Sequence, residues 1–255
     1  MADDNKLPIA HLVNPEPVRL HSDDLISMVE TARDAGAPGP TFLDRQNNPG
    51  PKHCSDILEG ARKVAVYLRN RGLEPGDKVI ILLMTSDLFT DAFFGTILAG
   101  GIPVPASPPM TFGDIGKYLM NMRHIVRNSE ARFMISFPRI RKVIGSVLSD
   151  ENELREFVLA RDITAEKPLR PGFPSIHADD PAFIQYTSGT TNLPKGVVLS
   201  HRALLSNAHG IGRGIDIQPD DMGVTWLPLF HDMGLIGSLL TALYNQAGLT
   251  VMMPE

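Results

Sequence analysis

The stretch EPGDKVIILLMTSDLFTDAFFGTILAGGIPVPASPP, residues 74–109, constrains the fold more than any other part of the sequence. It begins as a turn, continues as a strand that is apolar on both faces, and then reads as a helix and a second short strand. A strand of this kind is buried on both faces, and the order strand, helix, strand is typical of a parallel βαβ unit. The sequence therefore predicts an α/β fold of layered, mostly parallel sheets flanked by helices.

The same alternation continues along the chain. The other expected strands are residues 132–136, 182–187, 196–200, 222–226 and 249–253. The other expected helices run from a suitable N-cap at Ser55 to a stop at Gly72, from Ile115 to Asn128, and onward from Pro138, Ser200 and His231. These elements divide the chain into four parts: a turn-rich lead-in (1–54), a first α/β portion (55–148), a polar, proline-bearing connection (149–180) and a second portion (181–255).

Charge and cysteine content exclude several classes of protein. The net charge of −5 gives no general attraction to nucleic acid or anionic lipid. The longest apolar run, residues 78–84, is too short to span a membrane and suits a buried strand. The single cysteine, Cys54, excludes an intramolecular disulfide framework and a cysteine-based zinc site, and beside a helix start we expect it to be structural. The N-terminus has no signal-peptide pattern, so we expect a cytoplasmic protein.

The segment QYTSGTTNLPKGVVLSH, residues 185–201, carries the chemistry. Its glycines let the backbone approach a ligand, and its small hydroxyl side chains and lone lysine can surround a phosphate chain. The alternative is an ordinary solvated turn, since Thr, Ser, Gly and Asn are common turn residues. The segment is not the P-loop of nucleotide hydrolases, because Lys195 precedes a strand instead of opening a helix.

The core of this segment, YTSGTTNLPKG, resembles the phosphate-binding signature of the adenylate-forming superfamily, which includes acyl-CoA synthetases, luciferases and peptide-synthetase adenylation domains. The blocks LEPGDKVIILL and FFGTILAGGIPVPASPP are similar to earlier conserved blocks of that superfamily. TWLPLFHDMGLIGSLL resembles its next block in the form typical of fatty acyl-AMP ligases. Asn192 stands where the signature usually has glycine, and asparagine tolerates left-handed backbone angles, so the loop can still close.

The resemblance implies that a carboxylate is joined to the α-phosphate of ATP and pyrophosphate is released. It implies that the β- and γ-phosphates are held by the loop residues Thr187, Ser188, Gly189, Thr190, Thr191, Asn192 and Lys195. Lys195 would supply the positive charge for catalysis. A Mg²⁺ ion would bridge the phosphates, with Thr187 as its contact on this chain.

His231 is the second catalytic candidate. Without the resemblance, a histidine just before a helix is more often structural. In the family, the matching histidine lies at the acyl-carboxylate and adenylate site and helps to place the substrate. Asp232 is then the expected N-cap of the following helix. Gly234 and Gly237 would let that helix lie close to neighbouring backbone or leave room for an acyl chain.

Other polar and aromatic residues are expected to be structural. We expect Trp226 in the core, and His201 and Arg202 on the surface of a helix. The pairs Asp179–Asp180 and Asp220–Asp221 each precede a strand, where acidic turn residues are common, and carry no expected role.

The function that the resemblance implies is ATP-dependent activation of a fatty acid to its acyl-adenylate, followed by transfer to the thiol of an acyl carrier protein. A fatty acyl-CoA synthetase that uses coenzyme A is the alternative. Two other classes stay open: a non-catalytic nucleotide-binding or regulatory module, and a nucleotide hydrolase or kinase of different fold. The last residues, AGLTVMMPE, read as a core strand without its next crossover. We therefore expect the N-terminal part of a large AMP-binding domain, without the C-terminal lid domain and inactive alone.

Overall fold

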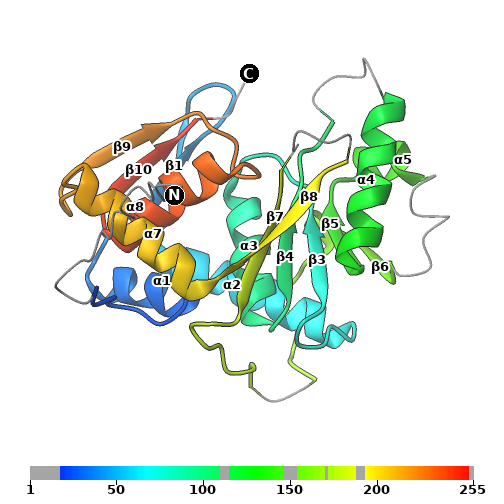
Figure 1. The fold of residues 1–255 in the computed structure, drawn as a ribbon, viewed down its shortest axis with the longest axis horizontal. Helices are drawn as coiled ribbons and strands as arrows, with labels where there is room; N and C mark the ends of the chain where they lie inside the picture. Colours follow the sequence, from blue (N-terminus) through cyan, green and yellow to red (C-terminus); the bar gives the residue numbers. More distant parts are fainter. Residues whose placement is uncertain (1–17, 110–114, 146–153, 170–171, 188–192, 253–255) are drawn as a thin grey trace, which may run out of the picture.

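The computed structural model describes residues 18–109, 115–145, 154–169, 172–187 and 193–252. Two groups of strands lie at opposite ends of the molecule, and a hairpin and several helices connect them (Figure 1). None of the described helices is both long and apolar enough to cross a membrane.

The first sheet is fully parallel in the order β4–β3–β5–β6. Its strands are β4 (Ile102–Pro105), β3 (Lys78–Ile81), β5 (Ala131–Ser136) and β6 (Glu156–Leu159). Alternate residues of β3 enter different cores: Val79 and Ile81 pack with the helices α2 (Cys54–Asn70) and α3 (Asp87–Leu98), whereas Ile80 packs with α4 (Ile115–Ser129) and α5 (Pro138–Val143). This two-sided burial is why the strand is apolar throughout.

A two-stranded antiparallel hairpin lies alongside this sheet. Its first strand, β7 (Pro181–Thr187), runs next to β4, and its second strand is β8 (Lys195–Ser200). The last pair of the hairpin joins Thr187 to Lys195, so these two residues bracket the hydroxyl-rich loop.

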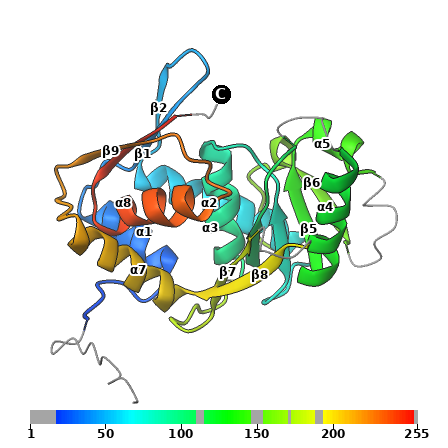
Figure 2. The same ribbon diagram turned by 45° about the horizontal axis from the view of Figure 1, so that its top comes forward.

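The second sheet has the order β2–β1–β10–β9. Its strands are β1 (Pro40–Leu43), β2 (Pro49–Pro51), β9 (Met222–Thr225) and β10 (Gly248–Val251), and the β1–β2 pair is its antiparallel part. Figure 2 shows α1 (Leu25–Asp34), α7 (His201–Gly214) and α8 (Thr241–Tyr244) gathered beside one face of this sheet. Apolar residues of these helices, of α2 and α3 and of β10 form one continuous core.

The structure confirms the predicted α/β architecture and corrects several local expectations. The lead-in is not only turns, since it contains α1, β1 and β2. The connection contains β6, which pairs with β5. The helix expected from Ser55 begins at Cys54, with His53 as its N-cap. Trp226 is 65% exposed instead of buried, because β9 is an edge strand and Met222 and Val224 are exposed beside it.

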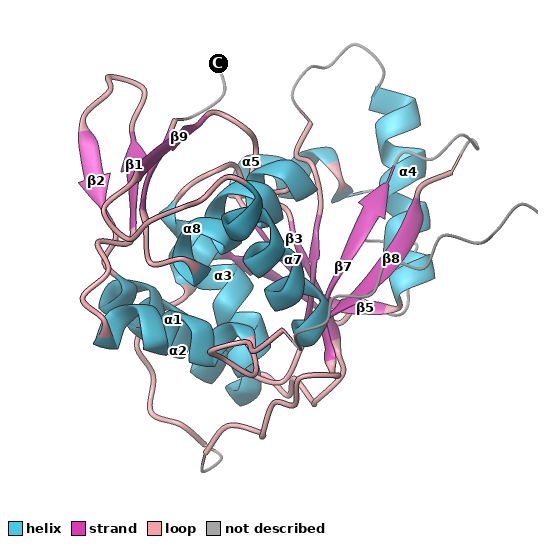
Figure 3. Cartoon of the chain, turned by 60° about the vertical axis from the view of Figure 1, so that its left-hand side comes forward, coloured by secondary structure: helices cyan, strands magenta, loops and turns pink. Residues whose placement is uncertain are grey.

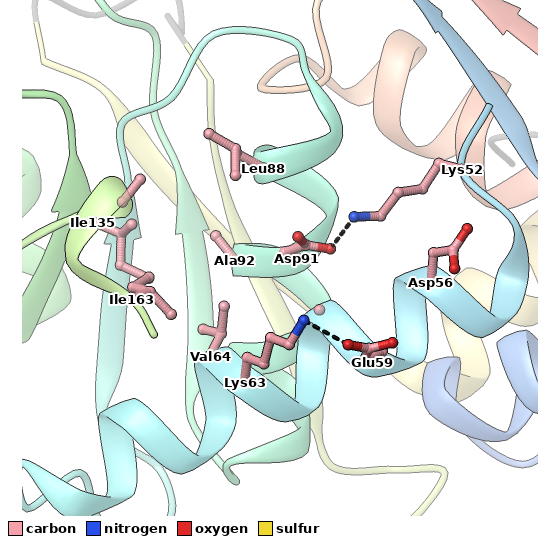
Figure 4. Close-up of a pocket in the computed structure, with 12 residues that line it drawn as sticks. Lys52, Asp56, Glu59, Lys63, Val64, Leu88, Asp91, Ala92, Ile135 and Ile163 are labelled. Atoms are coloured by element: carbon pink, nitrogen blue, oxygen red, sulfur yellow. Dashed lines mark ion pairs between the residues drawn. The ribbon is translucent and has the colours of Figure 1, made fainter. Parts of the chain in front are cut away.

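Helices α2 and α3 meet around a cavity of about 260 Å³ (Figure 4). Lys52 Nζ lies 2.7 Å from Asp91 Oδ1, and the two side chains are only 12% and 16% exposed. A Cβ added at Gly60 would lie 2.0 Å from Asp91 Oδ1, so the carboxyl group rests directly on the glycine backbone. The neighbouring pair of Lys63 and Glu59 is exposed to solvent. Burial raises the pKa of Asp91 against the opposing effect of Lys52.

His201 is also placed differently from the sequence expectation. Although it begins α7 and was expected on the helix surface, it is 2% exposed. The Leu25 amide donates a hydrogen bond to His201 Nδ1 at 3.2 Å, which ties the start of α1 to the start of α7. Accepting this bond requires Nδ1 to be unprotonated, and burial lowers the pKa of His201 below its ordinary value.

This geometry predicts an acid-sensitive contribution to stability. In the unfolded chain His201 takes up a proton as the pH falls below its ordinary value of 6.5, while the folded chain resists protonation. The free energy of unfolding should therefore fall as the pH drops from about 6.5 toward the lowered folded pKa, with a slope of at most about 1.4 kcal/mol per pH unit. The measurement is urea unfolding between about pH 7.5 and about pH 5, the range in which histidine ordinarily titrates.

The matched control is His201→Asn, whose Oδ1 can accept the same bond at the position of Nδ1 without titrating in this range. The difference in unfolding free energy between wild type and His201→Asn should change with pH. A difference that stays constant across the range would contradict the assignment.

Candidate active site

A cavity of about 500 Å³ opens where the carboxyl ends of β4 and β7 meet α4. It is lined by Pro105, Ala106, Ser107, Tyr118, Asn121, Met122, Ile125, Gln185, Tyr186, Thr187, Pro194, Phe230, His231 and Asp232. The carboxyl ends of parallel strands are the usual location of ligand sites in open α/β sheets. The cavity brings together two residues that the sequence singled out, Thr187 and His231.

One wall of the cavity is a single face of α4. Tyr118, Asn121, Met122 and Ile125 follow at the i, i+3, i+4, i+7 spacing of one helical face. The Tyr118 hydroxyl donates a hydrogen bond to the Ser107 carbonyl oxygen at 3.1 Å, which ties this wall to the segment after β4. Burial raises the pKa of Tyr118, so the phenol stays a neutral donor.

Two side-chain amide oxygens in this cavity are buried and have no hydrogen-bond partner among the described residues. They are Asn121 Oδ1 and Gln185 Oε1, and Gln185 is only 8% exposed. The Gln185 amide nitrogen lies 3.4 Å from the Phe230 carbonyl oxygen, so it also connects β7 to the segment that carries His231. Buried acceptors are normally paired, and these two are therefore available to a ligand that donates hydrogen bonds.

The segment before His231 is fixed by backbone contacts. The buried Leu229 amide donates to Thr85 Oγ1 at 3.0 Å, just beyond β3. Gly234 packs so closely that an added Cβ would lie 2.2 Å from the Pro228 carbonyl oxygen. The expectation that this glycine lets the helix approach backbone is confirmed. Gly237 makes no such approach, because the nearest atom to its added Cβ is Met233 Cε at 3.6 Å.

His231 lies at the mouth of the cavity with Asp232 beside it. His231 Nδ1 is 2.6 Å from Asp232 Oδ1, and the two side chains are 64% and 50% exposed. Asp232 Oδ1 also accepts the Met233 amide at 2.7 Å, so it caps the following helix as the sequence predicted. That helix, η2 (Met233–Leu240), has the wide turn of a π-helix, a form that is frequent at functional sites. A carboxylate at Nδ1 orients the imidazole and leaves Nε2 for a substrate.

The structure describes only the two ends of the hydroxyl-rich loop. Thr187 ends β7 and lines the cavity, and Lys195 begins β8 directly opposite Thr187, with an exposed side chain outside the cavity lining. Ser188, Gly189, Thr190, Thr191 and Asn192 lie outside the described residues.

Sequence reasoning missed Tyr118, Asn121 and Gln185 as members of the site. The helical spacing of the first two is visible in the sequence, but it does not say that this face of α4 meets β7. Gln185 lies within the segment of residues 185–201 that the sequence singled out. What distinguishes it from an ordinary strand residue is that its side chain is buried while its Oε1 accepts no hydrogen bond from the described residues.

Comparison with known proteins agrees with this geometry. A model of the family described as AMP-binding enzyme matches residues 52–255. A protein of Caulobacter vibrioides named as an acyl-CoA synthetase is 33% identical over 222 residues, which are 84% of this chain and 38% of that protein. The medium-chain fatty acid–acyl carrier protein ligase JamA of Moorena producens is 30% identical over 202 residues, 78% of this chain and 34% of that protein.

A solved structure from a study of fatty acyl-adenylate ligases of E. coli and L. pneumophila superposes with a TM-score of 0.86 at 27% identity, covering 93% of this chain and 43% of that one. The chain thus spans less than half the length of these relatives. With a family match across most of its length, and with Thr187 and His231 at one cavity beside a parallel sheet, the chain belongs to the AMP-binding enzyme family of adenylate-forming ligases.

Proposed function

We propose that this chain carries the phosphate- and acyl-binding part of a ligase that activates a fatty acid with ATP. A carboxylate oxygen attacks the α-phosphorus, the acyl–phosphate bond forms, and the bond to the β-phosphate breaks so that pyrophosphate leaves. The observation that carries the proposal is the cavity that Thr187 and His231 line together, in a chain of the AMP-binding enzyme family. Holding the two anions in one oriented site removes much of the entropic barrier to their reaction.

The resemblance to the adenylate-forming signature supports the following roles. The loop of Thr187, Ser188, Gly189, Thr190, Thr191 and Asn192 holds the β- and γ-phosphates, and Lys195 supplies positive charge. His231, oriented by Asp232, places the acyl carboxylate at the mouth of the cavity. The apolar wall of Met122 and Ile125 suits the first part of an acyl chain.

The Mg²⁺ expected in such a reaction would be held mainly by the phosphates. Among the described residues, no three His, Cys, Asp or Glu side chains gather at a place that could hold a metal. Mg²⁺ bound to a nucleotide commonly takes one or two protein ligands, with phosphate oxygens and water completing its octahedron. The Thr187 hydroxyl at the cavity fits such a ligand, and the ion would neutralise phosphate charge.

We propose that the thiol of an acyl carrier protein accepts the acyl group. We also propose that the enzyme acts in the cytoplasm. The form of the TWLPLFHDMG block and the name of the Moorena relative support a carrier protein. The name of the Caulobacter relative supports coenzyme A as the alternative.

The test is fatty-acid-dependent exchange of labelled pyrophosphate into ATP, with acids from short to long. It is run on the 255-residue chain and on the longest in-frame polypeptide that contains it, which we expect to be the active form. Lys195→Ala should slow exchange about 100-fold. Loss of one preorganised group that stabilises the negative charge of the transition state typically costs about that factor in rate. Lys167→Ala, at an exposed site outside the cavity lining, is the matched control and should leave the rate unchanged.

Two outcomes would overturn the proposal. Absence of exchange in a folded, extended protein would favour a non-catalytic nucleotide-binding module. ATP consumption without any carboxylic acid would indicate a hydrolase or kinase instead.

A further inference from the structure

The face of α4 that lines the cavity continues toward the C-terminal end of the helix, because Asn121, His124 and Asn128 follow at the i, i+3, i+7 spacing of one helical face. His124 contacts Pro194, the residue before β8, and Asn128, one turn further along the helix, contacts Tyr186 of β7. Figure 3 shows α4 beside the β7–β8 hairpin. Each of the two contacts falls one residue away from an end of the hydroxyl-rich loop.

The first contact holds the end where the loop rejoins the sheet. His124 Nε2 lies 2.8 Å from the carbonyl oxygen of Pro194, the residue just before Lys195. A carbonyl oxygen can only accept a hydrogen bond, so His124 must donate through a protonated Nε2. Proline has no amide proton of its own, so its carbonyl is the one backbone group at this position that a neighbouring element can hold.

The second contact holds the end where the loop leaves the sheet. The hydroxyl of Tyr186, the residue just before Thr187, donates to Asn128 Oδ1 at 2.6 Å. Tyr186 is paired with Gly196 across the hairpin, and a Cβ added there would lie 3.0 Å from the Tyr186 ring. The ring therefore rests on the glycine backbone, and Asn128 fixes both strands at this level.

These contacts matter because β8 is the more weakly supported strand of the hairpin. Ala182 and Phe183 of β7 are fully buried, whereas Val197 and Val198 of β8 are 45% and 60% exposed, and β7 is the one described strand with which β8 pairs. The terminal pair of the hairpin, Thr187 and Lys195, would fray first without a further tie.

We propose that His124 and Asn128 are positioning residues that hold Thr187 and Lys195 at the spacing needed to bind the triphosphate of ATP. This inference rests on the proposed function. Both residues lie outside the cavity lining, and their hydrogen bonds go to Pro194 and Tyr186, so each acts through the residue next to a loop end.

The experiment compares His124→Asn with His124→Gln in pyrophosphate exchange by the longest in-frame polypeptide. Gln carries its amide nitrogen the same number of bonds from Cβ as His Nε2, so it can donate to Pro194. Asn carries its nitrogen only as far as Nδ1 and cannot reach. His124→Asn should raise KM for ATP about tenfold, the upper range for one lost hydrogen bond, with kcat and the KM for fatty acid little changed. His124→Gln should restore the wild-type KM for ATP.

Controls separate this inference from simple loss of structure. Asn128→Ala should also raise KM for ATP, whereas Asn128→Asp, which keeps the acceptor oxygen, should not. His177→Asn, at an exposed site outside the cavity lining, should have no effect. Equal KM values for ATP in wild type, His124→Asn and His124→Gln would overturn the positioning role while leaving the proposed function intact. A wild-type protein without exchange would overturn both.

Discussion

Lys52→Met is expected to lower the free energy of unfolding by about 3–5 kcal/mol, the usual cost of removing one partner of a buried ion pair. Asp91 would keep its carboxylate in the cavity between α2 and α3, where it is 16% exposed and rests on Gly60. Methionine is close to lysine in length, so the loss comes from the unpaired charge more than from a new void. Urea unfolding at about pH 7.5, where an ordinary carboxyl group is ionised, measures the change.

The same cavity provides the matched control. Lys63→Met removes the cation of an exposed pair with Glu59, and such pairs contribute about 0–1 kcal/mol (Figure 4). A second variant, Lys52→Met with Asp91→Leu, should recover much of the lost stability, because apolar replacement of a buried pair is often neutral. Similar losses in Lys52→Met and Lys63→Met would show that burial does not distinguish the two pairs.

The pH dependence of Lys52→Met gives an independent check. Burial already raises the pKa of Asp91 in the wild type, and loss of Lys52 should raise that pKa further. The destabilisation is greatest above the raised pKa, where Asp91 is ionised in both states and its charge in the folded variant is buried and unpaired. As the pH falls from the raised pKa toward the ordinary value of 3.8, the folded variant takes up a proton before the unfolded chain does, and the difference from wild type should shrink.

The sequence predicts a structural feature well when that feature depends on residues that are close together in the chain. The βαβ unit at residues 74–109 is legible because Val79, Ile80 and Ile81 are all apolar, and that pattern needs no knowledge of distant segments. The helix α1 was missed for a different reason. Leu25, Met28, Val29 and Ala32 have helical spacing, and a capping box of Asp24 and Ser27 forms the start of the helix. The prolines and glycines on either side of this segment are more typical of turns and hide the helical signal.

Other features could not be read from the sequence because distant contacts create them. Strand β6 has four residues and depends on its pairing with β5. His201 is buried because α1 packs against the start of α7, and its partner Leu25 is 176 residues away. Trp226 is exposed because β9 lies at a sheet edge. In the site, the positions of Thr187 and His231 follow from motifs, whereas the roles of Tyr118 and Asn121 depend on how α4 packs.

Gly234→Ala is expected to damage the proposed site severely. The new Cβ would lie 2.2 Å from the Pro228 carbonyl oxygen and 2.8 Å from that of Leu227. Both atoms belong to the backbone, so no side chain can rotate away and the segment leading to His231 must shift. Displacement of a positioning group by about 1 Å commonly costs about 100-fold in rate, so pyrophosphate exchange should fall by about that factor.

The stability cost of Gly234→Ala should be smaller than its effect on exchange, about 1–3 kcal/mol for an overpacked site. Gly237→Ala is the matched control, three residues along the same helix, where the added Cβ meets only Met233 Cε at an ordinary 3.6 Å. That variant should keep its exchange rate and gain about 0.5–1 kcal/mol, because alanine is the better helix residue. If Gly234→Ala kept wild-type exchange while Lys195→Ala lost it, the close backbone contact at Gly234 would have no part in placing His231. If both glycine variants lost exchange equally, the effect would belong to the helix as a whole and not to the contact with Pro228.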